Sequence, residues 1–148
     1  MVELLVVLLL VALVSGMASL ALRDGSDFRL EREAMRLAAL LESGRAEARA
    51  SGVTVRFELA GDRPGASGDA AGKAYRFVGL PAAVLPPGHW LDPNVYARID
   101  GARALRLGPE PLIGAQRIVL ALGDERLVLG TDGLAPFAVQ RDAAASAP

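Results

Sequence analysis

The sequence predicts an α+β fold, in which one long N-terminal helix packs on an antiparallel β-sheet or sandwich. Three observations support this prediction. The first 22 residues carry a single ionisable side chain, the next 30 place apolar residues at helical spacing, and the remainder holds short alternating runs between turns. We therefore expect a transmembrane helix at 1–22, an amphipathic helix at 23–52, an antiparallel β domain at 53–141 and a disordered tail at 142–148.

Residues 1–22 read MVELLVVLLLVALVSGMASLAL, and Glu3 is their only ionisable side chain. At about 1.5 Å per residue, about 20 helical residues cover the roughly 30 Å hydrocarbon core of a bilayer. A helix that is apolar all round suits lipid, where it satisfies its own backbone hydrogen bonds. We therefore predict a membrane helix, whose apolar side chains include Leu4, Leu5, Val6, Val7, Leu8, Leu9, Leu10, Val11, Leu13 and Val14.

Two simpler interpretations of this segment compete. A cleaved secretory signal has a basic start and a shorter apolar core, whereas no Lys or Arg precedes this run; Ala18, Ser19 and Ala21 would then offer the cleavage site. An ordinary single-pass anchor explains everything except Glu3, because a carboxylate at mid-membrane costs about 2.5–3.5 kcal/mol. Glu3 lies near one end, where that cost is smaller, yet an intramembrane carboxylate usually has a partner.

Residues 23–52 predict an amphipathic helix. Gly25 is its weak point, since glycine costs about 1 kcal/mol in a helix interior, and Gly52 is the residue type that commonly follows a helix end. One side of this helix carries a row of apolar or small residues at three- and four-residue spacing. We call this row the apolar stripe and expect it to pack on the β domain: Leu30, Ala34, Leu37, Leu41, Gly44 and Ala48.

The charged residues of the same helix predict a solvated face. Arg29 with Glu33, and Glu42 with Arg45, stand at the spacing of helix-surface ion pairs. Exposed pairs of this kind contribute only a few tenths of a kcal/mol each.

The first half of the β domain predicts four strands. Apolar and polar residues alternate at 53–59, which is typical of a half-buried strand. We expect further strands at 75–78, 95–99 and 104–107, and a connection between the last two near Asp100-Gly101. The intervening segments predict irregular structure: a mobile loop rich in Gly, Ala and Asp at 60–74, and a proline-rich stretch at 80–94 that cannot be a central strand.

The second half predicts an antiparallel meander of three strands, at 117–122, 126–130 and 134–140. Gly123-Asp124 and Asp132-Gly133 separate these strands. Both dipeptides suit two-residue hairpin turns, which require positive φ.

Nothing in the sequence predicts a catalytic, cofactor or metal site. The single histidine, His89, lies in a loop, and there are no cysteines. Asp62, Asp69, Asp92 and Asp100 are scattered and lack the spacing of a calcium loop. A net charge of −1 does not suggest a nucleic-acid partner. Trp90 is expected to pack over a sheet edge.

The N-terminal residues carry a family resemblance. Val2-Glu3-Leu4-Leu5-Val6-Val7-Leu8, followed by the apolar run 9–13, resembles the processed start of type IV pilins and type II secretion pseudopilins. The resemblance implies that a prepilin peptidase removes a short basic leader and methylates the new N-terminus. It also implies that Glu3 pairs with the terminal amine of a neighbouring subunit during assembly.

The leader, its terminal Gly and the aromatic residue typical of that family do not precede Val2-Glu3 here. The positive-inside rule also calls for Lys or Arg on the cytoplasmic flank. We therefore expect the natural start to lie further upstream.

Within this family, residues 37–42, 45–52, 107–113 and 132–137 are similar to the H-type minor pseudopilins of type II secretion. The resemblance implies a pilin-like fold and a structural role in the periplasmic pseudopilus. It implies a bacterial inner-membrane protein with its C-terminal domain in the periplasm, whose partners are other minor and major pseudopilins and the inner-membrane assembly platform. A minor pilin of a type IV pilus, or a membrane-tethered binding module that never polymerises, are the alternatives.

Overall fold

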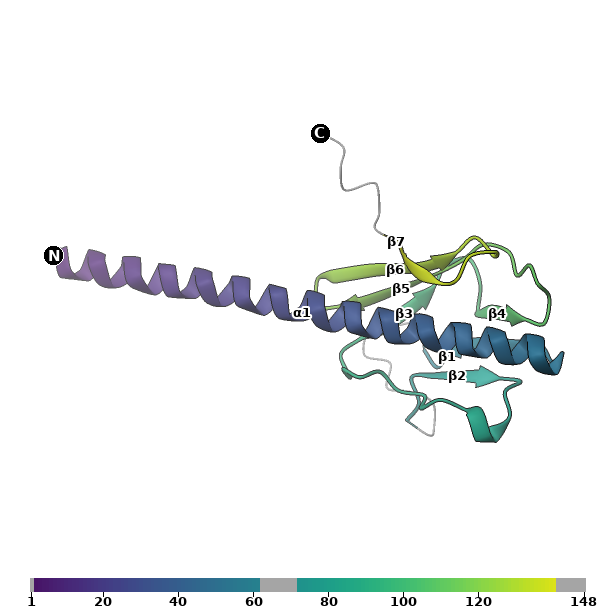
Figure 1. The fold of residues 1–148 in the computed structure, drawn as a ribbon. Helices are drawn as coiled ribbons and strands as arrows, with labels where there is room; N and C mark the ends of the chain where they lie inside the picture. Colours follow the sequence, from purple (N-terminus) through teal and green to yellow (C-terminus); the bar gives the residue numbers. More distant parts are fainter. Residues whose placement is uncertain (1, 62–71, 141–148) are drawn as a thin grey trace.

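A computed structural model describes residues 2–61 and 72–140, except for the side chains of residue 2 and residues 14–24. The fold is α+β, with one long helix and two antiparallel sheets (Figure 1). Helix α1 spans Val2–Ser51, and a 3-10 turn, η1, spans Ala82–Val84. The strands are β1 Val55–Leu59, β2 Tyr75–Val78, β3 Tyr96–Ile99, β4 Ala104–Gly108, β5 Gln116–Leu122, β6 Glu125–Thr131 and β7 Ala138–Gln140.

Helix α1 runs without interruption through Gly25 and ends at Ser51. Gly52 follows with a φ of 67°, which confirms the predicted helix end. The N-terminal part of α1 projects beyond the β domain, and its C-terminal part lies along that domain (Figure 1). There α1 contacts both sheets, through β1 and β4 of one and β5, β6 and β7 of the other.

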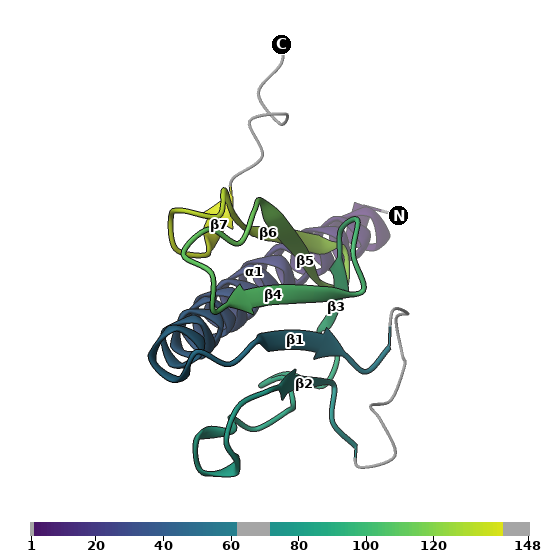
Figure 2. The same cartoon turned by 90° about the vertical axis from the view of Figure 1, so that its right-hand side faces the viewer.

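The two sheets have the strand orders β2-β1-β4 and β3-β5-β6-β7. Figure 2, which views the molecule nearly along α1, shows β2, β1 and β4 one above another. The predicted meander is confirmed, since β5 pairs with β6 and β6 with β7. Strands β3 and β4 belong to different sheets, so the connection at Asp100-Gly101 passes from one sheet to the other.

The side chain of Gln116 links the sheets at this crossing. Its Oε1 accepts a hydrogen bond from the backbone N–H of Arg106 at 2.7 Å, and its Nε2 donates to the Arg106 carbonyl at 2.9 Å. Gln116 belongs to β5 and Arg106 to β4. One side-chain amide therefore makes the two bonds that a neighbouring strand would make to the edge of β4.

One of the two predicted hairpin turns is confirmed. Gly123 and Asp124 join β5 to β6, which pair from Leu122 with Glu125, and Gly123 has a φ of 61°. The two-residue turn at Asp132-Gly133 is wrong, because β6 ends at Thr131 and β7 begins only at Ala138. The intervening residues are held by other hydrogen bonds, described below.

Two predicted irregular segments fall largely outside the described residues: most of the loop 60–74, and the tail 142–148. The proline-rich stretch 80–94 contains η1 and no strand.

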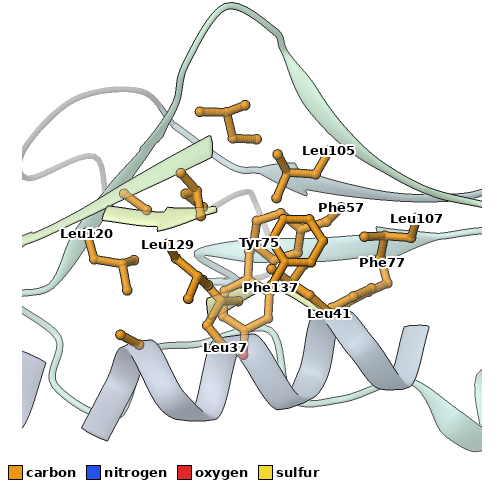
Figure 3. Packing of buried hydrophobic residues seen from close by; sticks show 14 of the residues in the cluster. Leu37, Leu41, Phe57, Tyr75, Phe77, Leu105, Leu107, Leu120, Leu129 and Phe137 are labelled. Atoms are coloured by element: carbon orange, nitrogen blue, oxygen red, sulfur yellow. The ribbon is translucent and has the colours of Figure 1, made fainter. Parts of the chain in front are cut away.

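The core lies between the C-terminal part of α1 and the two sheets (Figure 3). Leu37 and Leu41 point from α1 toward an aromatic group of Phe57, Tyr75 and Phe77. The Phe57 ring centroid lies 5.3 Å from that of Tyr75 and 5.2 Å from that of Phe77. Such tilted and edge-on pairs add to the stabilisation from burying apolar area.

Gly44 allows a close approach of helix and sheet. A Cβ at this position would lie 3.0 Å from Leu107 Cδ1 and 3.2 Å from Phe77 Cε1. The absence of a side chain therefore lets α1 settle onto β2 and β4.

We expect Gly44→Leu to destabilise the fold by about 2 kcal/mol or more, because overpacking a filled core outweighs the gain in helix propensity. Chemical unfolding of the full chain measures the change. Ala39→Leu, which adds the same side chain on the exposed side of α1, is the control and should change stability little. Equal effects of the two variants would contradict the close approach at Gly44.

Candidate assembly helix and its attachment to the β domain

The N-terminal part of α1 carries an exposed apolar surface. Its leucines and valines are 49% to 69% exposed: Leu4, Leu5, Val6, Val7, Leu8, Leu9, Leu10, Val11 and Leu13. Glu3 lies in the first turn of the helix and is exposed. Val14, the last residue of the predicted set, lies among those whose side chains are not described.

Within the described residues, no helical segment has both the length and the apolar character that crossing a membrane requires.

The structure places the apolar stripe against the sheets. Leu30, Leu37 and Leu41 are at most 1% exposed. Ala34 and Ala48 are also fully buried, and Gly44 faces Leu107 and Phe77. The same helix thus has one part with its apolar residues uncovered and one part with them packed.

Arg45 is the first of two polar attachments that flank the stripe. The predicted pair of Arg45 with Glu42 is present, at 3.7 Å, but the Arg45 side chain is only 2% exposed, so the prediction that this pair is solvent-exposed is wrong. Nη2 donates to the Gly133 carbonyl at 2.6 Å and Nη1 donates to the Ala135 carbonyl at 3.1 Å. Nη2 also lies 3.5 Å from the Pro111 carbonyl. Arg45 therefore holds two loops, one before β5 and one before β7.

Glu42 supports the same contact. Its Oε1 lies 3.7 Å from Arg45 Nη1 and accepts a hydrogen bond from the backbone N–H of Phe137 at 3.0 Å. Arg45 thus binds a carbonyl, and Glu42 an amide, of the same loop between β6 and β7.

The loop that Arg45 binds has its own internal hydrogen bonds, which explain why it is not a two-residue turn. One oxygen of Asp132 accepts from the N–H groups of Leu134 and Ala135, at 2.8 and 2.7 Å. The Thr131 hydroxyl accepts from the Gly133 N–H at 2.9 Å and donates to the Ala135 carbonyl. The hydrogen bonds from Ala135 and Leu134 hold the pKa of the Asp132 carboxyl below its ordinary value of 3.8.

Glu33 is the centre of the second attachment. Its side chain is 1% exposed, so the predicted exposed pair with Arg29 is also wrong. Glu33 instead pairs with Arg36 at 2.8 Å and accepts the backbone N–H of Leu91 at 2.6 Å. Arg36 donates to the His89 carbonyl at 3.3 Å.

Arg29 extends this attachment by one turn, because it pairs with Asp92 at 3.1 Å. Residues 29, 33 and 36 therefore bind one loop, 89–92, from successive turns of the helix. Trp90 in this loop is partly buried, with its ring centroid 4.7 Å from that of Tyr75. Burial raises the pKa of the Tyr75 hydroxyl above its ordinary value of 10.0. His89 is exposed.

The sequence contains a signal for the buried charges that the predicted solvated face overlooked. Arg45 follows Leu41 by four residues and precedes Ala48 by three, so it stands at the edge of the apolar stripe. Glu33 is likewise three residues after Leu30 and four before Leu37.

The arrangement supports attachment and presentation of a helix. Among the residues that the structure describes, no cluster of His, Cys, Asp and Glu could hold a metal ion. Comparison with known proteins found no matching family model, curated protein or solved structure.

We expect Arg45→Met to lower the free energy of unfolding by about 3 kcal/mol, since hydrogen bonds to a charged group contribute about 1.5–3 kcal/mol each and the buried Gly133 carbonyl would lose its bond to Arg45. Arg49→Met, on the exposed surface of the same helix, is the matched control and should cost little. Chemical unfolding of both variants tests this. A loss no larger than that of Arg49→Met would contradict the role of Arg45.

The lowered pKa of Asp132 predicts that the stability of the fold depends on pH. Because its folded pKa is depressed, its contribution to stability is present above the ordinary value of 3.8 and is lost as pH falls through the lower folded pKa. Asp132→Asn keeps an acceptor oxygen but does not titrate. From about pH 5 to about pH 2, the unfolding midpoint of this variant should therefore fall less steeply than that of the unchanged protein. Parallel curves would show that Asp132 contributes nothing to acid unfolding.

Proposed function

We propose that this chain is a minor pseudopilin, a structural subunit of the periplasmic pseudopilus of a type II secretion system. It assembles through its N-terminal helix. The observation that supports this function best is the division of α1, whose N-terminal part is apolar and uncovered while its C-terminal part is attached to a β domain.

The uncovered part requires a partner of some kind. Removing apolar surface from water is worth about 25 cal/mol per Å², so a row of leucines and valines that are about half exposed or more favours lipid or neighbouring helices. In the proposed function, this part of α1 lies in the membrane before assembly and packs against other subunits afterwards. A helix whose N-terminal part assembles and whose C-terminal part carries a β domain is the arrangement of a pilin-like protein.

The membrane segment of the proposal rests on the sequence of residues 1–22 as a whole. The chain would cross the bacterial inner membrane once, with its β domain in the periplasm. The two polar attachments support this arrangement, since they fix the β domain rigidly to the helix that other subunits would bind.

Glu3 is the proposed assembly residue. A lone carboxylate in lipid favours its neutral form, whereas a cation beside it favours the charged form. The terminal amine of a neighbouring subunit supplies that cation, and an isolated subunit lacks it. The partners are therefore other minor and major pseudopilins, together with the inner-membrane assembly platform. The role is structural rather than catalytic.

Glu3→Leu tests this proposal in the protein expressed from its own gene, with whatever precedes residue 1. We expect membrane extraction and β-domain folding to be unchanged, because the variant removes a polar group from lipid. Crosslinking to partner pseudopilins should fall roughly fivefold to tenfold, which corresponds to about 1–1.4 kcal/mol of association free energy. Export of a secreted reporter should fall with it.

Glu31→Leu, an exposed glutamate farther along α1, is the control and should crosslink normally. Normal crosslinking and normal export with Glu3→Leu would overturn the assembly role of Glu3. Crosslinks to pilus subunits in place of secretion pseudopilins would favour a minor pilin of a type IV pilus. A chain that inserts but crosslinks to neither would be a membrane-tethered binding module.

A further inference from the structure

The end of the β domain from which α1 projects has a hollow beside the helix. Its volume is about 460 Å³, and it is lined by Arg29, Arg32, Leu91, Asp92, Pro93 and Asn94. Two large apolar side chains stand near it, Phe28 on α1 and Leu91 on the loop, and each is 60% exposed. The hollow thus combines two arginines with uncovered apolar groups.

Both arginines bend back along α1 toward its N-terminus. Arg29 Nε donates to the carbonyl of Gly25 at 3.0 Å, one turn earlier. The Arg32 guanidinium lies 5.7 Å from the centre of the Phe28 ring, also one turn earlier. Helical side chains lean in this direction in general. The positive charges therefore lie closer to the apolar segment than their own Cα atoms do.

Their position along the helix corresponds to the headgroup layer of a bilayer. The apolar run ends at residue 22, so Gly25 and Phe28 lie about 4.5 and 9 Å beyond it at 1.5 Å per residue. Each headgroup layer is about 5–8 Å thick, from the difference between the whole bilayer and its hydrocarbon core. Gly25 thus falls within the headgroup layer and Phe28 at its outer surface. The guanidinium of Arg29 would stand among the headgroups, and that of Arg32 at their outer surface, where a tilt of the helix brings it within reach of the lipid phosphates.

The charges near the hollow favour an anion at Arg32. Asp92 already pairs with Arg29 at 3.1 Å. No carboxylate in the described part of the chain forms an ion pair with Arg32, whose guanidinium lies over the Phe28 ring. Asp124 and Glu125 line an adjoining hollow at the β5–β6 turn, which shares Arg29 and Asn94 with the first hollow. Asp27 and Glu31 on α1 are not three or four residues from Arg32, so they do not face it along the helix. Arg29 therefore lies between the two hollows, whereas Arg32 lines only the one beside the loop, away from Asp124 and Glu125.

We propose that this end of the β domain docks on the membrane surface by binding the phosphate of an anionic phospholipid at Arg32, with Arg29 beside it. Phe28 and Leu91 enter the interfacial layer, where aromatic side chains are favoured. The inference rests on the membrane segment of the proposed function. Docking tilts the domain so that the loop 91–94 faces the bilayer and the acidic β5–β6 turn faces away.

Trp90 is the only tryptophan of the chain and adjoins Leu91, so its fluorescence reports on the docked loop. The full chain is placed in vesicles of phosphatidylcholine, with or without phosphatidylglycerol, that carry a quencher on the headgroup. We expect stronger quenching with phosphatidylglycerol. Arg32→Gln should lower the ratio of docked to undocked protein about fivefold, the effect of one arginine near an anionic surface.

Arg49→Gln removes the same charge from the far end of the helix and should leave quenching unchanged. Flotation of the vesicles separates the two proposals. A chain that does not float with vesicles overturns both the membrane segment and the docking. A chain that floats but whose Trp90 is quenched equally in neutral and anionic vesicles overturns the docking alone. Arg32→Gln and Arg49→Gln variants that lose the same amount of quenching would also overturn the docking.

Discussion

The buried guanidinium of Arg45 is the interaction on which the rest of the domain depends. It sits at the edge of the apolar stripe and binds backbone carbonyls of two loops far along the chain. A planar fork of donors can satisfy several carbonyls at once, which a lysine ammonium of the same charge could not do in this geometry. Burying a charge is costly unless such partners are present, so helix and loops require each other.

Arg45 and Glu33 also fix the register of the helix. Apolar packing along the stripe is not directional, so a helix shifted by one turn could still bury leucines against the sheets. Hydrogen bonds from Arg45 to Gly133 and from Leu91 to Glu33 do not tolerate such a shift. The apolar stripe therefore supplies most of the stabilisation, and the two charged contacts determine a single position.

The predictions from sequence succeeded where the cause is local. The end of α1 at Ser51, the strand at Tyr75–Val78 and the β5–β6 turn follow from spacing, alternation and turn residues within a few positions. The buried charges and the long β6–β7 connection were missed because their partners are remote. Arg45 and Gly133 are 88 residues apart, and nothing near Asp132 in the sequence reveals that a helix would bind this loop.

The amide of Gln116 has a consequence for how copies of this protein meet. An open strand edge invites pairing with another chain, and natural sheets usually block it. Here one side chain occupies both the donor and the acceptor of Arg106, so that the edge of β4 is closed at its middle. In the pseudopilus that we propose, β domains would be held close together, and such a closed edge would disfavour strand-to-strand aggregation and leave contacts between subunits to the helix.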